Sequence, residues 1–366
     1  MNLIGGKAFI DGKFIQTDIS ITNDVISEIG KITKDNDFVD CSGKYIIPGL
    51  VDIHTHGCAG FDFSSASVDE IAEMQKCYLK NGITSILATT VSLSNDDIKS
   101  AVKNITDASE KKVNGAKIKG INLEGPYLSA KKCGAHDSSL LKEPEIDFIE
   151  SLGDFIKVVN VAPEYKNASD FITNFKGKTS IAHTDCDYET AKNAIDHGAD
   201  HITHIFNAMN ALHHRNPGVI GAFFDSDAIA EMICDGIHIA LPILKMMFTA
   251  YPDRIAIISD SMAATGLSDG CYKLGALDVT VKDCVATLSD GTLAGSAKNI
   301  YNMMKYLIEN GIDAESVIKS VTEIPAKSVG IDDSCGLIKT GRIADIIILN
   351  TDFTIDKIIF NGNIIS

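Results

Sequence analysis

The sequence predicts an α/β protein: a (β/α)8, TIM-like barrel with a small β-sandwich domain built from both chain ends. Three observations support this prediction. Eight short apolar runs alternate with longer stretches of helical periodicity. Residue types that can bind metals follow several of these runs, and a parallel barrel places its chemistry at the C-terminal ends of its strands. Both chain ends instead show short alternating segments separated by turn residues.

The central part of the chain supplies the strands and helices of the barrel. Parallel strands need crossover helices, which cover the sheet on its outside. Two of the intervening stretches, VDEIAEMQKCYLKNG and YETAKNAIDHG, end in glycine as a helix C-cap does. The segment LDVTVKDCVATLSDGTLAGS predicts a hairpin inserted before the last helices. The eight expected strands are residues 50–54, 84–90, 118–124, 157–163, 179–184, 201–206, 230–234 and 255–260.

The two chain ends predict a second, smaller unit. Near the N-terminus, the turn pairs Asp11-Gly12 and Asn23-Asp24 separate alternating apolar positions. Near the C-terminus, GRIADIIILN and TIDKIIFNG show the same pattern. Neither piece is large enough to bury a core alone. We therefore expect residues 1–48 and 337–366 to join into the small β-sandwich domain, and residues 49–336 to form the catalytic barrel.

Composition excludes several classes of function. The 366 residues are 45% hydrophobic, enough for a full core. The net charge of −16 argues against a nucleic-acid or anionic-membrane partner. Nine scattered cysteines without a CxxC pair are typical of reduced thiols in a cytosolic protein. The first residues show no basic segment before an apolar one, and no apolar run approaches the ~20 residues of a membrane helix. A soluble, cytoplasmic protein is expected.

Five potential metal ligands and one acid form the strongest functional signal, and each lies at or just beyond the end of an apolar run. Zinc and iron(II) accept imidazole and carboxylate ligands, and a catalytic site leaves one position open for water. In an extended strand, two histidines separated by one residue face the same side. We predict a divalent metal site with one or two ions per subunit; zinc is the expected ion, with iron(II) or manganese as alternatives. The predicted ligands are His54, His56, Glu124, His183 and His204, and the acid is Asp260.

Two further histidines mimic a metal-binding helix. His197, His201 and His204 are spaced by four and three residues, as on one helical face. Gly198 interrupts that helix, however, and HITHIF alternates like a strand. His197 and His201 are then expected at a helix end and a strand start, on the opposite side of the barrel, and are not included in the site.

Several motifs together resemble one family of enzymes. PGLVDIHTHG, NLEGPY, AHTD, THIFNAMNALHHRNPG, DGIHI, SDSMAATG and LAGS are similar to the N-acetylglucosamine-6-phosphate deacetylases of the amidohydrolase superfamily. The resemblance covers nearly the whole chain, through GLIKTGRIADIIIL. The HxH motif marks only the superfamily, whereas LEGP, THIFNAM with a downstream arginine, and DGIHI are narrower. The resemblance implies metal-dependent removal of the acetyl group from N-acetyl-D-glucosamine 6-phosphate, which gives D-glucosamine 6-phosphate and acetate.

The resemblance also implies roles for individual residues. A bound metal lowers the pKa of its water from about 16 to about 7 and supplies hydroxide. Asp260 would take a proton from the attacking water and return it to the departing amine; the alternative for this residue is a helix N-cap. His238, in DGIHI, would polarise the acetyl carbonyl or hold the oxyanion. The expected substrate contacts are Ala135, His136, Asn207, Ala208, His238, Leu293, Ala294 and Gly295.

Arg215 is the candidate phosphate ligand. It is one of only three arginines, and the arginine fork binds a phosphate bidentately where lysine cannot. An exposed surface residue is the alternative, because HHRNPG reads as a loop. In related enzymes the arginine comes from the neighbouring subunit, which implies a homodimer. Some relatives lack the HxH histidines and hold one metal; this chain keeps both, so Glu124 would bridge two ions or serve the first alone. Cys186, where relatives usually have alanine, is expected to be a packing residue.

Two other functions stay open at this point. Another amidohydrolase, either dihydroorotase-like or acting on a different N-acyl amino sugar, would share the metal and Asp260 but would not bind a phosphate. A catalytically inactive barrel that serves as a scaffold is the second alternative. A scaffold would be free to lose its ligands, and all six positions are intact here.

Overall fold

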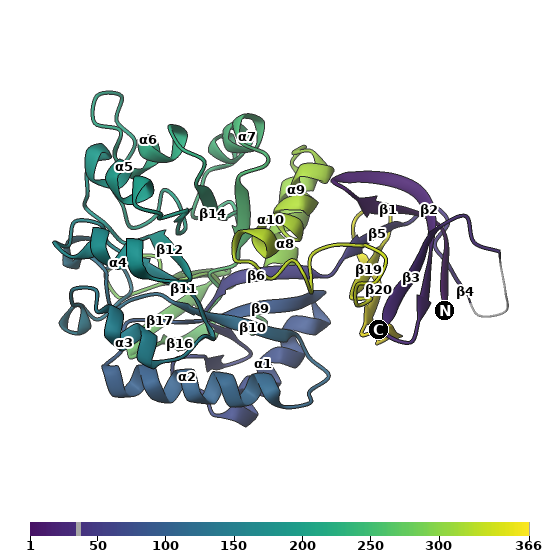
Figure 1. Cartoon of the computed structure of the whole chain (residues 1–366), viewed down its shortest axis with the longest axis horizontal. Coiled ribbons are helices and arrows are strands. Elements are labelled where there is room, and N and C mark those ends of the chain that lie inside the picture. The colour runs from purple at the N-terminus through teal and green to yellow at the C-terminus, as the bar shows by residue number, and fades with distance from the viewer. Residues whose placement is uncertain (34–37, 366) are drawn as a thin grey trace.

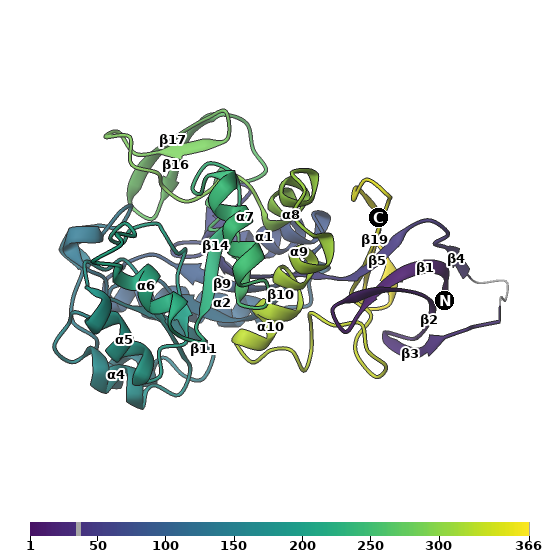
Figure 2. The same cartoon turned by 90° about the horizontal axis from the view of Figure 1, so that it is seen from above.

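The computed structural model describes residues 1–33 and 38–365, and it shows a helix-covered barrel beside a smaller β unit (Figure 1). Residues 34–37, which fall within the predicted small domain, and residue 366 lie outside the described residues. Both chain ends lie in the smaller unit, on the same side of the barrel in both views (Figures 1 and 2). Strands from both ends therefore join, as the sequence predicts.

Eight parallel strands form the barrel, in the order in which they occur along the chain. At the end of β6, Thr55 bridges Ser261, and the Asp260 amide donates to the His54 carbonyl at 3.0 Å, so the chain leaving the last strand lies beside the first. This confirms the predicted barrel. The strands are β6 (Leu50–Thr55), β9 (Ile83–Thr90), β10 (Lys117–Leu123), β11 (Ile156–Val161), β12 (Lys178–Ile181), β13 (His201–Ile202), β14 (Ile229–Ile233) and β15 (Ile255–Ile258).

The helices cover the outside of the barrel (Figures 1 and 2). The two glycines predicted to end helices, Gly82 and Gly198, lie just beyond α1 and α5 with positive φ values of 75° and 116°. Ser67 begins α1 with a capping box that involves Glu70. The helices are α1 (Val68–Lys80), α2 (Asn95–Glu110), α3 (Ile146–Ser151), α4 (Ala168–Asn174), α5 (Tyr188–Asp196), α6 (Gly218–Phe224), α7 (Leu241–Ala250), α8 (Ile300–Glu309), α9 (Ala314–Ser320) and α10 (Glu323–Ser328). None of the described helices is long and apolar enough to cross a membrane.

The smaller unit is one mixed sheet that folds over on itself. Its order is β21-β20-β19-β5-β1-β2-β3, with β4 paired to β1. The Ile26 amide on β3 donates to the Arg342 carbonyl at 2.8 Å, so the β3 edge returns to the segment that leads into β19. This single sheet, built from strands of both chain ends, has an apolar core of its own. The strands are β1 (Asn2–Ile10), β2 (Lys13–Thr22), β3 (Val25–Gly30), β4 (Phe38–Asp40), β5 (Tyr45–Pro48), β19 (Ile346–Leu349), β20 (Ile355–Phe360) and β21 (Asn363–Ile364).

Two short β structures lie near the mouth of the barrel. The predicted hairpin is present as β17 (Leu277–Lys282) and β18 (Val285–Thr287), and β16 (Gly270–Leu274) adds a third strand. This sheet lies away from the small β unit (Figure 2). A two-stranded pair, β7 (Gly57–Cys58) and β8 (Phe61–Asp62), follows the first barrel strand.

The sixth barrel strand is shorter than predicted. Residues 201–206 alternate like a strand, but β13 ends at Ile202. His204 and Phe206 have φ values of 29° and 80°, and this left-handed backbone cannot continue a strand. The chain therefore turns where the sequence pattern suggests that it continues straight.

Candidate metal centre

The six residues of the predicted centre all lie at the C-terminal mouth of the barrel and are at most 8% exposed. Three of them lie two residues beyond the end of a strand: His183 after β12, His204 after β13 and Asp260 after β15. Their φ values are 43°, 29° and 47°. Left-handed backbone is uncommon for residues other than glycine, and strained conformations of this kind cluster at functional sites. The turns bend these side chains toward the centre of the mouth.

The first group of ligand atoms surrounds one oxygen of Glu124. His56 Nε2 lies 3.0 Å from Glu124 Oε2 and 3.1 Å from Asp260 Oδ1. His54 Nε2 lies 3.5 and 3.7 Å from the same two oxygens. One ligand atom from each of these four residues lies within 4.8 Å of the others. The set of two imidazoles and two carboxylates suits a divalent cation.

The second group surrounds the other oxygen of the same carboxylate. Glu124 Oε1 lies 2.9 Å from His204 Nε2 and 3.2 Å from His183 Nε2. The two imidazole nitrogens are 3.0 Å apart. Because each oxygen of Glu124 faces a different group, its carboxylate can bridge two ions.

The buried polar atoms support this metal assignment. His54 Nε2 is buried and has no hydrogen-bond partner among the described residues, although it faces two carboxylates. An unpaired buried nitrogen is costly, and a cation placed between these groups would coordinate it. His183 Nδ1 lies 2.8 Å from the Lys132 carbonyl oxygen, the kind of second hydrogen bond that metal-binding histidines usually make. The residues present therefore fit a divalent metal.

Electrostatics keep both acids of the centre ionised. Before an ion binds, burial alone would raise the pKa of Glu124, but the charge of His54 and hydrogen bonds from His136 and His183 hold the pKa well below its ordinary value. Burial would also raise the pKa of Asp260, and its hydrogen bond with His56 lowers it instead. Burial would lower the pKa of His56, whereas its hydrogen bonds to Asp260 and Glu124 raise it to about 9.

A cavity of about 240 Å³ opens above the metal centre. Among the described residues that line it, none is a lysine or arginine. His136 lies at its edge, with Nε2 3.3 Å from Glu124 Oε2 and Nδ1 accepting from the Ser92 amide at 3.1 Å. The lining includes most of the predicted substrate contacts: Ala135, His136, Asn207, Ala208, His238, Leu293 and Gly295.

Three predicted site residues do not line this cavity. His54 is fully buried beneath it, with none of its surface exposed. Ala294 packs in the apolar cluster under the β16–β18 sheet. Arg215 lies in the exposed loop of residues 211–216, where its Nη1 contacts His214 Nε2 at 2.8 Å. Within a single chain, Arg215 is therefore apart from the centre that it was predicted to serve.

The structure also brings in residues that the sequence analysis missed. Asp235 Oδ2 accepts from His238 Nδ1 at 2.8 Å and so orients a predicted catalytic residue. Glu231 contacts His54 Nδ1 at 3.2 Å from within β14. A charged residue inside the apolar run AEMIC was the available signal, because an unpaired charge is rarely buried. Leu274 and Thr292 reach the cavity from the inserted sheet and the loop that follows it, and no motif marks them.

The two histidines that were left out of the site have different positions. His197 follows α5 and is exposed, and its Nδ1 contacts the Asn193 carbonyl at 2.7 Å. His201 begins β13, is buried, and contacts Glu231 Oε1 through Nδ1 at 3.0 Å. Neither lines the cavity, but His201 is linked to His54 through Glu231.

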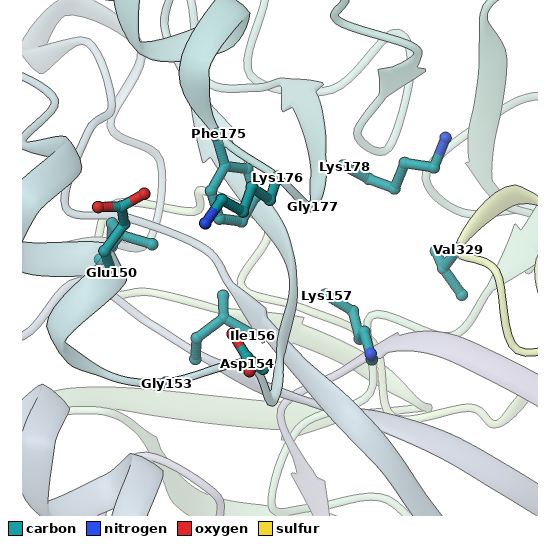
Figure 3. Close-up of a pocket in the computed structure, with 11 residues that line it drawn as sticks. Glu150, Gly153, Asp154, Ile156, Lys157, Phe175, Lys176, Gly177, Lys178 and Val329 are labelled. Carbon is teal, nitrogen blue, oxygen red and sulfur yellow. The ribbon is translucent and has the colours of Figure 1, made fainter.

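A larger hollow, of about 510 Å³, lies at the opposite end of the barrel, where β11 and β12 begin (Figure 3). Three lysines line it, but their side chains point in different directions (Figure 3). Only Lys178 has an ion-pair partner among the described residues, Asp200 at 2.5 Å. The amino groups of Lys157 and Lys176 do not converge on one point, so this hollow offers no comparable site.

Known proteins similar to this chain have the same kind of fold and chemistry that the barrel mouth suggests. A model of the amidohydrolase family matches residues 45–365. The chain belongs to the amidohydrolase family. Its barrel and its buried clusters of histidines and acids are consistent with the binuclear metal site of an amidohydrolase.

Within this family, the chain is similar to several deacetylases of N-acetylated sugar 6-phosphates. The chain is 36% identical over 332 residues to N-acetylglucosamine-6-phosphate deacetylase of Bacillus subtilis, covering 87% of this chain and 84% of that protein. It is 30% identical to N-acetylgalactosamine-6-phosphate deacetylase of Escherichia coli O157:H7, with 88% of each chain covered. A mutant N-acetyl-D-glucosamine-6-phosphate deacetylase of Mycobacterium smegmatis, solved with N-acetyl-D-glucosamine 6-phosphate, superimposes with a TM-score of 0.93 at 29% identity, covering 100% of this chain and 98% of that one.

Proposed function

We propose that this amidohydrolase removes the acetyl group from N-acetyl-D-glucosamine 6-phosphate, giving D-glucosamine 6-phosphate and acetate. The observation that carries the proposal is the convergence of His56, Glu124, His204 and Asp260 on one small cavity, in a chain that matches such deacetylases over most of its length. An inactive scaffold does not need this costly burial of ionised groups. The intact centre therefore favours an enzyme.

The proposed cofactor is zinc, with iron(II) or manganese as alternatives, because nitrogen and oxygen ligands suit all three. Such an ion lowers the pKa of a coordinated water to about 7 and polarises the amide carbonyl. His183, His204 and Glu124 would hold one ion. His54, His56 and the second oxygen of Glu124 would hold another.

Asp260 and His238 are proposed to perform the proton transfer and the carbonyl activation. The ionised Asp260 carboxylate lines the cavity and can accept a proton from water, then return it to the leaving nitrogen. His238 also lines the cavity. Because its Nδ1 is held by Asp235, its Nε2 is left to donate to the acetyl carbonyl oxygen when the ring is protonated.

The phosphate is proposed to bind Arg215 of a second copy of the chain. No described lysine or arginine lines the cavity, so a single subunit lacks a cation for a dianionic group. The loop of residues 211–216, including Leu212 with 45% of its surface exposed, is available for contact with another subunit. A homodimer in which Arg215 reaches the neighbouring cavity satisfies both observations.

The proposed setting of the enzyme is the cytoplasm, without nucleic-acid or membrane partners. The net charge of −16 disfavours anionic polymers. All nine cysteines are free thiols in the structure. Thiols that stay reduced are typical of a cytosolic protein.

The decisive measurement compares the hydrolysis of N-acetylglucosamine with and without the 6-phosphate. We expect the phosphorylated sugar to have a kcat/KM at least a hundredfold higher, since losing charge-assisted hydrogen bonds costs about 1.5–3 kcal/mol each. Equal kcat/KM values would remove the phosphate-specific function. Protein that stays inactive after loading with Zn²⁺, Fe²⁺ or Mn²⁺ would instead support a scaffold.

N-acetylgalactosamine 6-phosphate is the second candidate substrate, because a relative with that named activity is 30% identical. The two sugars differ only in the configuration of one hydroxyl group. The same assay with both phosphates distinguishes them, and a higher kcat/KM for the galactose epimer would reassign the substrate.

A further inference from the structure

Glu231 lies behind the metal centre, inside the barrel, with none of its surface exposed. Its two carboxylate oxygens contact different histidines: Oε2 is 3.2 Å from His54 Nδ1, and Oε1 is 3.0 Å from His201 Nδ1. A buried carboxylate without partners costs several kcal/mol. The two imidazoles are therefore what allow a charge in the middle of β14.

His201 supplies the charge that neutralises Glu231. Its Nδ1 faces the carboxylate, and its Nε2 lies 3.3 Å from the carbonyl oxygen of Ser328 in α10. Both neighbours accept hydrogen bonds, so both ring nitrogens must donate, which only the imidazolium form can do. The second oxygen of Glu231 then remains available for His54.

The surroundings of His54 identify which of its nitrogens carries the proton. Asn122 Nδ2 lies 3.4 Å from Nδ1, but it already donates to the Ile53 carbonyl at 3.0 Å. The orientation of this amide is fixed, because its Oδ1 accepts from Asn160 at 2.6 Å. The shorter, charge-assisted contact with Glu231 thus takes the proton of Nδ1. When an ion binds, Nε2 is therefore the nitrogen that offers its lone pair to the metal centre.

The other half of the centre is anchored differently. His183 Nδ1 lies 2.8 Å from the Lys132 carbonyl, so a backbone group fixes this ring. Among the described residues, the Glu231 side chain contacts His54 and His201 but forms no hydrogen bond or ion pair with His183 or His204. Its direct contact with the centre is therefore made through His54, which belongs only to the group formed by His54, His56, Glu124 and Asp260.

We propose that Glu231 is a positioning residue that fixes His54 with its proton on Nδ1 and thereby allows the chain to hold a second divalent ion. This inference rests on the metal centre of the proposed function. It predicts that the two ions depend on different residues outside the ligand set: Glu231 for one and the Lys132 carbonyl for the other.

The test is a titration of metal-free protein with Zn²⁺ in competition with a chromophoric chelator. We expect the wild-type chain to bind two ions. In Glu231→Gln, the affinity for one ion should fall roughly 10–100-fold, the usual effect of losing such a partner, while the other stays within about twofold. Glu323→Gln is the matched control, because Glu323 is also buried and ion-paired, with Lys327, but lies away from the centre. It should change neither affinity.

A second variant separates metal binding from folding. Glu231→Gln leaves the His201 imidazolium without its partner, whereas Glu231→Gln combined with His201→Gln removes both charges. The double variant should show the same selective loss, with cooperative thermal unfolding. The proposal would be overturned if the affinity for both ions fell equally, or if neither fell. It would also be overturned if the wild type bound a single ion, or if both variants failed to fold. Selective loss in a chain that does not deacetylate the sugar phosphate would uphold the role of Glu231 and reject the proposed function.

Discussion

The two ends of the barrel both carry charged groups around a hollow, but they arrange them in opposite ways. At the C-terminal mouth, ionised and ionisable side chains are almost fully buried and their atoms lie about 3 Å apart, as between Glu124 Oε1 and His204 Nε2 at 2.9 Å. At the other end, the side chains of Lys157, Lys176 and Lys178 point apart around a larger hollow (Figure 3). Size therefore does not identify the functional end.

The two ends differ in the free-energy cost of their charged groups. Burial of like and unlike charges in one place is unfavourable unless something pairs them, so a chain that keeps such a cluster keeps it for a ligand. The three lysines at the other end are partly or fully exposed and cost little, because water and salt screen their charges. The convergence of buried donors is thus the feature that separates the mouth from the hollow at the opposite end.

The largest effect is expected for Asp260→Asn. The amide cannot take a proton from water, so kcat should fall roughly 10²–10⁴-fold, the contribution typical of a positioned general base. Steady-state kinetics with the sugar phosphate measure this, and elemental analysis should show that the variant keeps its metal. Asp253→Asn, at an exposed aspartate paired with Lys319, is the control and should be unaffected. A near-normal kcat would remove Asp260 from its role.

Removal of the metal should have the next largest effect. Without a cation, the buried nitrogens and oxygens of the centre lose their common partner, and the free energy of unfolding should fall. A ligand at about a thousand times its Kd stabilises the native state by about 4 kcal/mol. Denaturant unfolding before and after chelation, and again after adding Zn²⁺, measures this difference. If the unfolding curves with and without metal superimposed, the buried histidines and acids would be stable without an ion. Their burial would then no longer indicate a metal site at this end of the barrel.

The sequence predicted the barrel because its strands are marked locally, by apolar runs followed by polar residues. It could not mark where the strands end. The run 201–206 continues the alternation, yet β13 stops at Ile202, because the backbone is left-handed at His204 and the next amide, of Ile205, donates to the Glu231 carbonyl at 2.9 Å. In the small unit, β1 pairs in parallel with β5, a non-local choice that the order of turns did not indicate.

The predicted ligands could be selected from the sequence for the same local reason, whereas Glu231, which lies behind them, could not. His54 and His56 form a motif, and Glu124 ends a strand. Glu231 and Asp235 act only through the histidines that they contact, across the barrel or within one turn. Glu231 and His54 are far apart in the sequence, and only the folded barrel brings them together. Asp235, in contrast, lies three residues before His238 within DGIHI, so the motif itself was the available signal for this contact.

Arg215→Ala should have an intermediate effect on catalysis. It tests whether the cavity at the barrel mouth needs a residue of a second subunit. Losing a charge-assisted contact to the phosphate should raise KM roughly tenfold or more. Hydrolysis of unphosphorylated N-acetylglucosamine is the internal control and should not change. Arg215→Lys should recover only part of the loss, because lysine lacks the bidentate fork.

Mixing two inactive variants shows which subunit supplies the arginine. In a heterodimer of Arg215→Ala and Asp260→Asn chains, an arginine that acts across the interface leaves one cavity with both groups intact. Activity in the mixture should then exceed the mean of the two separate variants after subunit exchange. A mixture that equals that mean would place Arg215 in its own cavity or outside the reaction.

The smallest effect is expected at the far end of the barrel, where Lys157→Gln combined with Lys176→Gln removes two cations from the larger hollow. Because these amino groups do not converge and no described residue holds them in ion pairs, neither a bound anion nor the fold depends on them. Values of kcat/KM for the sugar phosphate should stay within about twofold, and inorganic phosphate should shift the unfolding temperatures of wild type and variant equally. A shift in unfolding temperature confined to the wild type would reveal an anion site at this end. In that case, the convergence of buried imidazoles and carboxylates would no longer be enough to distinguish the functional end of the barrel from the other.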